Sequence, residues 1–213
     1  FEETGSLWLV HYNLAINEKK ATAWYIFFNE FQMLEFSEDD FYKAIRRYIT
    51  MQEDEAMPSS RVISDDFKCI INTYYAGKRY GRESIDPENN IECPLTELGL
   101  INYVSTVQGN RIYRKCTPKI ENIPELIVLY AILKQTGEQK EIKISTLQSA
   151  ENSIGRIFLL DTLSLLNILY KLESMGFIKV VRTAGLDVIR IQKEITPEEC
   201  AELYYNELNG NQR

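Results

Sequence analysis

The chain has 213 residues, of which 45% are hydrophobic and 26% are charged, a composition typical of a globular protein of one or two domains. No run approaches the roughly 18 consecutive apolar residues that cross a membrane, and the first residues lack the basic and then apolar order of a signal peptide. We therefore expect a cytoplasmic protein with no membrane partner. The net charge of −7 argues against a protein that coats DNA through general electrostatics, since Lys and Arg must neutralise phosphates.

Residues 1–36 predict a hairpin of two apolar helices. Residues 7–16 and 21–36 are apolar on nearly every side, and the polar residues 17–20 give the short connection of an antiparallel pair. Both Trp residues and the only His of the chain lie here among many Tyr and Phe residues. Aromatic residues at this density ordinarily build a core, so we expect the hairpin to be central.

Residues 37–120 predict two helices followed by a β-hairpin. The first helix begins at Ser37, an N-cap followed by three acids, and the second covers residues 64–77. Strands are expected at residues 100–107 and 111–116, around a turn at 108–110 where glycine supplies a positive φ. This order is typical of a winged helix.

Residues 121–195 repeat that order, and a terminal helix fills 196–213. Gly176 ends the long third helix as its left-handed cap, and Thr196 with Glu199 is in capping-box register. The expected fold is therefore mainly α with small β-hairpins (α+β), as one helical hairpin plus two winged-helix-like units. The predicted helices are 123–135, 144–150, 160–175 and 196–208, and the predicted strands are 177–182 and 187–192.

Common cofactor motifs are missing from the sequence. The four cysteines form no C-x-x-C pair, which argues against a zinc ribbon or a thioredoxin-like site. No G-x-x-x-x-G-K-[ST] sequence occurs, so we expect no bound nucleotide and no zinc.

Positive charge is local in this acidic chain, because residues 109–119 and 76–82 contain several bases and no acid. Basic residues beside predicted helices and hairpins are candidates for contacts with DNA phosphates. The alternative is that they form solvated surfaces, and that the C-terminal copy packs against a partner. The candidates are Arg61, Lys68, Lys78, Arg79, Arg82, Arg111, Arg114 and Lys115 in the first copy, and Lys179, Arg182 and Arg190 in the second.

Several segments of the chain have a recognisable set of residues, which are Gly5, Leu7, Trp8, Leu9, His11 and Tyr12, then Ala21–Tyr25 and Phe27–Asn29, then Cys93–Leu95, Glu97–Ile101 and Thr183–Leu186. These segments resemble a bacterial domain-of-unknown-function family found in DNA phosphorothioation systems. The family includes the nicking component of the Ssp-type system, in which one DNA strand carries a phosphorothioate as a defence mark. Its longer members begin with a further region resembling a small DNA-binding domain, so the resemblance implies that this chain is a fragment.

Three residues within the resembling segments are candidates for catalysis of a nick. His11 would act as base, Glu30 as ligand of a divalent magnesium or manganese ion, and Asn29 as phosphate binder. The same residues are equally suited to tying two buried helices together through hydrogen bonds. No H-N-H, G-I-Y-Y-I-G or P-D-x(n)-D/E-x-K nuclease motif occurs in the sequence.

Two functions remain open. The preferred one is a DNA-binding component of a phosphorothioation system, with strand nicking implied by the resemblance and with DNA and other proteins of the system as partners. The alternative is a non-catalytic regulator or adaptor of the same system, which the acidic net charge favours.

Overall fold

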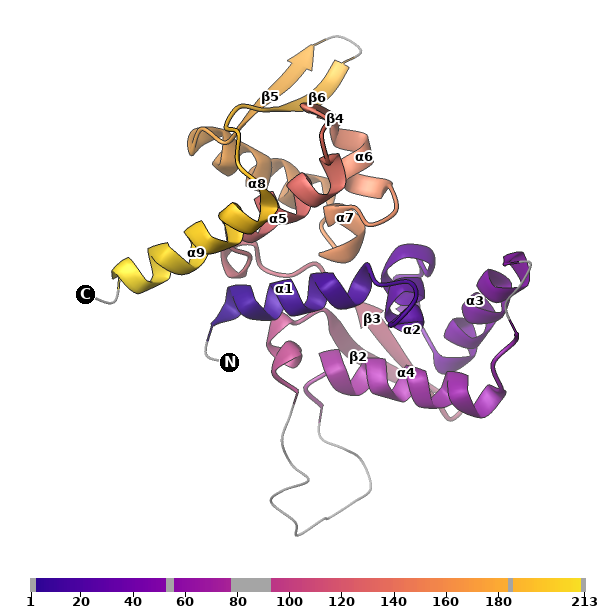
Figure 1. Cartoon of the computed structure of the whole chain (residues 1–213). Coiled ribbons are helices and arrows are strands. Elements are labelled where there is room, and N and C mark those ends of the chain that lie inside the picture. The colour runs from indigo at the N-terminus through magenta and orange to yellow at the C-terminus, as the bar shows by residue number, and fades with distance from the viewer. Residues whose placement is uncertain (1–2, 53–55, 78–92, 184–185, 212–213) are drawn as a thin grey trace. The chain divides into compact units, whose positions relative to one another are not determined.

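The computed structural model describes residues 3–52, 56–77, 93–183 and 186–211 (Figure 1). Helices dominate these residues, and the strands form two three-stranded antiparallel sheets, which confirms the expected α+β class. The contacts divide the chain into two compact units. Unit 1 consists of the described residues from Asn13 to Thr117, and unit 2 of those up to Tyr12 and from Pro118 onward.

The segment 1–36, grouped by its sequence, is divided between the two units. Helix α1 (Thr4–Ala15) contributes its residues up to Tyr12 to unit 2. There the Trp8 indole N–H donates to the carbonyl of Asn122 at 2.7 Å, and Trp8 and Tyr12 pack edge-on against Phe158 at centroid distances of 5.1 and 6.0 Å. The start of α1 therefore completes the core of unit 2.

The predicted second helix is shorter than expected. Helix α2 (Thr22–Tyr25) continues into a π-helix, η1 (Ile26–Glu30), and the chain then becomes extended, so the expectation of a helix up to Phe36 is wrong. Residues Glu35–Phe36 instead form strand β1, which pairs with β3 (Asn110–Lys115). Sheet pairing and burial of the Phe36 ring prevail over local helical periodicity.

Unit 1 continues with α3 (Glu38–Met51), α4 (Ser60–Tyr74), η3 (Pro94–Leu98) and β2 (Ile101–Val107). The predicted cap of α3 is confirmed: Ser37 Oγ accepts from the Asp40 N–H at 3.3 Å, and Asp40 accepts from the Ser37 N–H at 2.9 Å. The β2–β3 hairpin is also confirmed, with Gly109 at φ 85° in its turn. The sheet order is β1-β3-β2.

Lys115, the last residue of β3, is buried in the centre of unit 1. Its ammonium group donates to the carbonyls of Phe27, at 2.5 Å, and of Phe31, at the end of η1. It also lies 4.3 Å from the ring centroid of Phe27 and 5.1 Å from that of Phe31. These carbonyls and rings stabilise a cation that would otherwise be costly to bury. The Lys115 backbone N–H donates to the carbonyl of Leu34 at 2.9 Å, so one residue holds the segment from η1 to β1 against β3.

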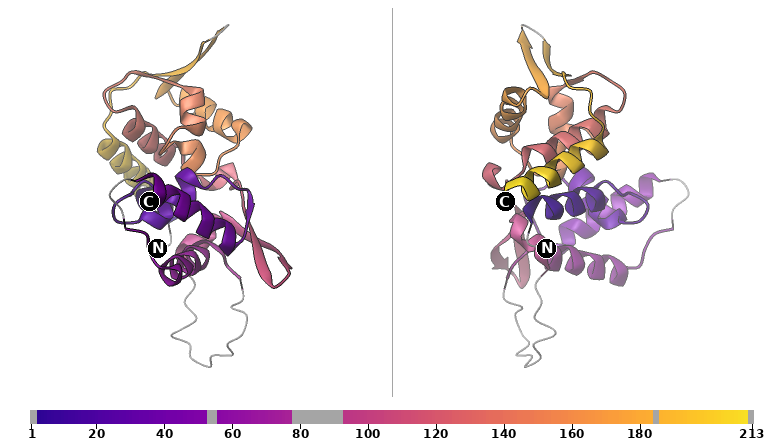
Figure 2. Two further views of the ribbon diagram at one scale, coloured as in Figure 1. Left: turned by 90° about the vertical axis from the view of Figure 1, so that its right-hand side faces the viewer. Right: turned by 60° about the vertical axis from the view of Figure 1, so that its left-hand side comes forward.

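Unit 2 consists of helices around a second three-stranded sheet, ordered β4-β6-β5. Its β5–β6 hairpin extends beyond the helices of that unit in both views of Figure 2. The elements are η4 (Ile120–Asn122), α5 (Glu125–Thr136), β4 (Glu141–Lys143), α6 (Ile144–Ser149), α7 (Ile154–Ile157), α8 (Thr162–Ser174), β5 (Ile178–Thr183), β6 (Leu186–Ile191) and α9 (Pro197–Asn211).

Local sequence determines where the helices of unit 2 begin and end. Asp161 caps α8 by accepting from the Ser164 N–H at 2.7 Å, and Gly176 follows with φ 77°, as predicted. The capping box of α9 is present, since the Thr196 N–H donates to Glu199 at 2.8 Å and the Glu199 N–H donates to Thr196 at 3.1 Å.

Both units have the same order of elements. In each, a helical segment precedes a short strand, further helices and a hairpin, and the last strand lies in the middle of the sheet. Within the described residues no single helix is both long and apolar enough to cross a membrane, although one pair bent by 89° meets the length and composition requirements jointly.

Burial of Lys115 predicts a pH-dependent contribution to stability. Burial lowers the pKa of Lys115 from 10.5 to about 7, while the unfolded chain keeps the higher value. The unfolded state therefore binds more protons between these two pKa values, and the free energy of unfolding increases with pH there. We expect the free energy of unfolding of the wild type, measured in urea titrations, to increase between pH 6 and pH 9 by roughly 2–3 kcal/mol more than that of Lys115→Met. Equal pH profiles for the two proteins would contradict a buried, titrating Lys115.

Candidate nucleic-acid interface

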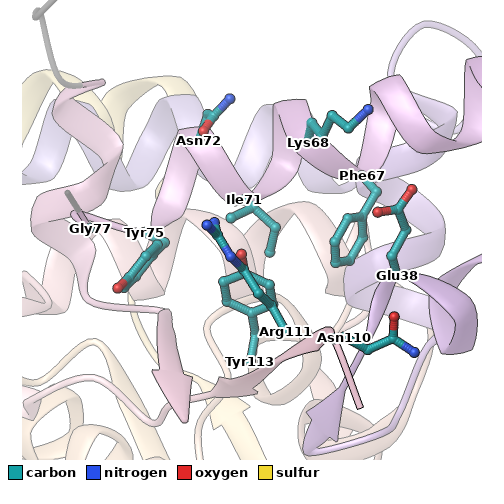
Figure 3. Close-up of a pocket in the computed structure, with 11 residues that line it drawn as sticks. Glu38, Phe67, Lys68, Ile71, Asn72, Tyr75, Gly77, Asn110, Arg111 and Tyr113 are labelled. Atoms are coloured by element: carbon teal, nitrogen blue, oxygen red, sulfur yellow. The ribbon is translucent and has the colours of Figure 1, made fainter. Parts of the chain in front are cut away.

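Helix α4 and the β2–β3 hairpin of unit 1 line an open cavity of about 440 Å³ (Figure 3). Helix α4 contributes Phe67, Lys68, Ile71 and Asn72, and Tyr75 and Gly77 follow it. The hairpin contributes Gly109, Asn110, Arg111 and Tyr113, and Glu38 at the start of α3 completes the lining. The cavity therefore joins aromatic rings, amides, two cations and one carboxylate.

Arg111 is the hairpin cation of this cavity. Side chains alternate along a strand, so Arg111, Tyr113 and Lys115 lie on the same face of β3. Arg111 is exposed and lies opposite Thr106 in the register of the hairpin. Figure 3 shows its guanidinium directed from the hairpin toward α4. A cation is thus held between a helix and a hairpin.

The cations of α4 are only weakly neutralised. Arg61 and Lys68 lie 3.8 and 3.7 Å from the carboxylate of Asp65, and all three side chains are at least 60% exposed. Exposed ion pairs of this kind contribute about 0–1 kcal/mol, so a phosphate can compete for both cations. The α4 surface is therefore accessible to an anion despite the neighbouring acid.

Four other predicted DNA-contacting cations are engaged with carboxylates. Three of them lie directly opposite an acid in the register of a sheet, which favours cross-strand ion pairs. The pairs are Arg114 with Glu35, Arg182 with Asp187 at 3.4 Å, Arg190 with Glu141 at 2.6 Å, and, outside the register, Lys179 with Glu173 at 3.1 Å.

Lys115 does not lie on the surface with the other predicted DNA-contacting residues. Only 6% of the residue is exposed, and its ammonium donates to backbone carbonyls, so it cannot also reach a phosphate. Sequence reasoning counted it as basic surface because alternation along β3 is visible only once the pairing of the strand is known. Lys78, Arg79 and Arg82 lie outside the described residues.

The candidate base His11 is fully buried in unit 2. One ring nitrogen, Nε2, lies 2.7 Å from the carbonyl oxygen of Ile157, so Nε2 carries the proton and donates. Burial lowers the pKa of His11 to about 4, although the Ile157 carbonyl acts in the opposite direction. At neutral pH the ring is therefore neutral and serves a hydrogen bond within the core.

Asn29 and Glu30 belong to η1 in unit 1. The Asn29 side chain is fully buried and its Nδ2 donates to the carbonyl of Ala15 at 3.0 Å, which ties α1 to η1. Glu30 is partly exposed at the last position of η1. The structure thus places the three catalytic candidates in different surroundings, two of them within a core.

The described residues do not fit the magnesium or manganese ion expected for hydrolysis. Among them, no group of three or more His, Cys, Asp or Glu side chains converges as ligands of a metal ion. We therefore assign no metal ligand and derive no chemical step through a metal.

The charge pattern of the sequence predicts the two cations of the cavity but not its uncharged lining. Lys68, Asn72 and Tyr75 follow one another at helical spacing, a pattern that could have grouped them on one face. The sequence alone does not group Asn110 and Tyr113 with these residues, because the hairpin reaches the site through its packing on α4.

The buried environment of His11 predicts an unusual titration. Because His11 is the only histidine of the chain, its ring gives a single Cε1–H resonance in the NMR spectrum. We expect this resonance to stay constant from pH 8 to pH 5 and to titrate with a pKa of about 4. The stability contributed by the neutral ring should fall as the pH decreases from 6.5 toward 4, because the unfolded state binds the proton first. A titration midpoint near 6.5 would contradict the buried placement.

Comparison with solved structures gives the fold a close structural match. A crystal structure of magnesium ion-bound SspB superposes with a TM-score of 0.77 at 22% sequence identity, and covers 100% of this chain and 69% of the SspB chain. A second SspB crystal structure gives a TM-score of 0.75 at 23% identity, with 99% and 61% covered. This chain thus spans about two thirds of the length of the SspB chains.

Sequence comparison identifies the family. No protein with a curated description shows significant sequence similarity to the chain. The model of one family does match, over residues 1–205. The chain therefore belongs to the family described as protein of unknown function DUF4007.

Proposed function

We propose that this protein is a DNA-binding component of a bacterial DNA phosphorothioation system, and that α4 and the β2–β3 hairpin of unit 1 form its DNA-contacting surface. The observation that carries the proposal is the cavity between these elements, with Lys68 on one side and Arg111 on the other. The family and the structural likeness to SspB support the placement in such a system.

The element order of unit 1 supports a winged-helix mode of binding. In helix-turn-helix proteins the second helix of the motif enters the major groove, and neighbouring segments contact the backbone. From their order along the chain, we assign α4 to the role of that second helix and the β2–β3 hairpin to that of the wing. Residues 99–119, which include the hairpin, contain no acid, so a phosphate meets no repulsion from this segment.

The other unit offers a weaker DNA surface. Its hairpin cations lie 2.6–3.4 Å from Glu141, Glu173 and Asp187, closer than Arg61 and Lys68 lie to Asp65, so a phosphate competes there with shorter ion pairs. We therefore propose that the acidic chain binds DNA through unit 1 alone.

Binding to duplex DNA should depend on the cations of the cavity. For the double variant Lys68→Gln/Arg111→Gln we expect about a tenfold or greater loss of affinity in fluorescence anisotropy, and a salt slope smaller by about 2, because each lost phosphate contact releases about one counterion fewer. The same titration is made with Lys179→Gln/Arg182→Gln, a matched change of two hairpin cations in unit 2.

The control variant should bind with nearly wild-type affinity and salt slope. The assignment to unit 1 would be wrong if the control lost affinity while the Lys68/Arg111 variant kept it. Absence of DNA binding by the wild-type chain would contradict the proposed function as a whole.

The resemblance to the family also implies strand nicking, and we include this activity in the proposal. Of the three candidates, Glu30 is the one with exposed surface, whereas His11 and Asn29 are fully buried. In a buffer that contains Mg²⁺ or Mn²⁺, we expect the wild-type chain to convert supercoiled plasmid to the open circular form, and Glu30→Gln, which changes the exposed candidate, to abolish this without lowering the melting temperature. Equal conversion by both proteins would show that Glu30 takes no part in the reaction. Absence of conversion by the wild type would count against nicking by this chain.

An adaptor role is the second candidate, and the surface of α8 favours it. Leu163 and Tyr170 lie on this helix and are 73% and 44% exposed, and the basic residues of the neighbouring hairpin are neutralised. Exposed apolar side chains of this kind suit contacts with a protein better than contacts with phosphates. A pure adaptor differs from the preferred function in having no salt-dependent affinity for DNA.

A further inference from the structure

We propose that the cavity between α4 and the β2–β3 hairpin binds a single unpaired nucleotide of DNA, with the base inside and the flanking phosphates at the rim. The inference rests on the proposed DNA-binding function and adds a preference for unpaired DNA. A volume of about 440 Å³ lies within the usual range of small-ligand sites, roughly 300–1,000 Å³, and suits one nucleotide rather than a base pair.

The ring of Tyr75 provides a surface for stacking of the base. Tyr75 is partly exposed, whereas Tyr113 and Phe67 are buried beside it: Tyr113 packs edge-to-face against Tyr75 at 5.8 Å and against Phe67 at 6.1 Å. Stacking of bases on Tyr and Phe is the main source of affinity for single strands, because every base presents a flat face. Bases within a duplex are already stacked on their neighbours and do not offer that face.

The ring of Tyr75 depends on a neighbouring glycine for its position. A Cβ atom at Gly77 would lie only 1.9 Å from Tyr75 Cε1. Any other residue at this position would therefore displace the ring or the backbone. Gly77 is needed for close packing here, and not for an unusual φ angle.

The polar groups of the cavity match the remaining parts of a nucleotide. We assign two cations of the rim to the phosphates on either side of the bound base: Arg111, whose guanidinium is directed toward α4 in Figure 3, and Lys68, which lies on α4. The Asn72 and Asn110 amides can donate to and accept from the edge of a base, which an unpaired base leaves without partners. Extruding a base from a duplex costs free energy, and this cost is least where the base is unpaired.

The test compares one fluorescein-labelled strand in three forms: perfect duplex, duplex with one unpaired nucleotide, and single strand. In anisotropy titrations of the full chain we expect about tenfold tighter binding to the bulged duplex than to the perfect duplex. Tyr75→Leu should reduce this preference to less than about twofold. Tyr170→Leu, which removes a comparably exposed ring on α8 of unit 2, is the matched control and should keep the preference.

If Tyr75→Leu lowers the stability of the protein, a second variant tests the role of the same ring. Gly77→Ala keeps every polar group and ring but moves the Tyr75 ring, and it should also lose the preference at an unchanged melting temperature. Equal affinity of the wild type for bulged and perfect duplex would overturn the inference and leave the proposed function intact, whereas no binding to any form would overturn both. Competition by free thymidine monophosphate as strong as that by the bulged strand would also overturn it, because the site would then take free nucleotides.

Discussion

The hydrogen bonds of the buried Lys115 amino group are the interaction on which the architecture of unit 1 depends. The group donates to the carbonyls of Phe27, within a π-helix, and of Phe31, directly after it, and lies among phenylalanine rings, while the backbone of the same residue pairs with Leu34. π-Helices are rare and their carbonyls are poorly satisfied at the ends, so a buried donor has a defined role there. The contact fixes strand β3 relative to the segment that precedes β1.

The position of β3 in turn determines the candidate site. Side chains alternate along a strand, so a slip of one residue would turn Arg111 and Tyr113 away from α4. Lys115 occupies the same face two residues further on and is held by Phe27 and Phe31, which excludes that slip. The buried Lys115 thereby positions Arg111 of the candidate site. The third basic residue of the strand, Arg114, pairs with Glu35 on the opposite face.

Features determined by local sequence could be predicted, and those determined by tertiary contacts could not. The Ser37 cap, the Gly109 turn and the Gly176 cap follow from the conformational preferences of a few neighbouring residues. The division of α1 between units, the helix end before Phe31 and the burial of Lys115 depend on residues distant in sequence. For the site, charge pointed to Arg111 and Lys68, whereas the aromatic and amide lining became visible only through packing.

Hydrogen–deuterium exchange of the full chain, with and without duplex DNA, tests most directly whether unit 1 carries the DNA-contacting surface. Backbone amides exchange more slowly where a ligand covers and stabilises their segment. DNA should slow exchange in residues 61–77 and 108–114 and leave residues 178–183 and 186–191 unchanged. Slower exchange confined to the β5–β6 hairpin, or no change anywhere at saturating DNA, would contradict the claim.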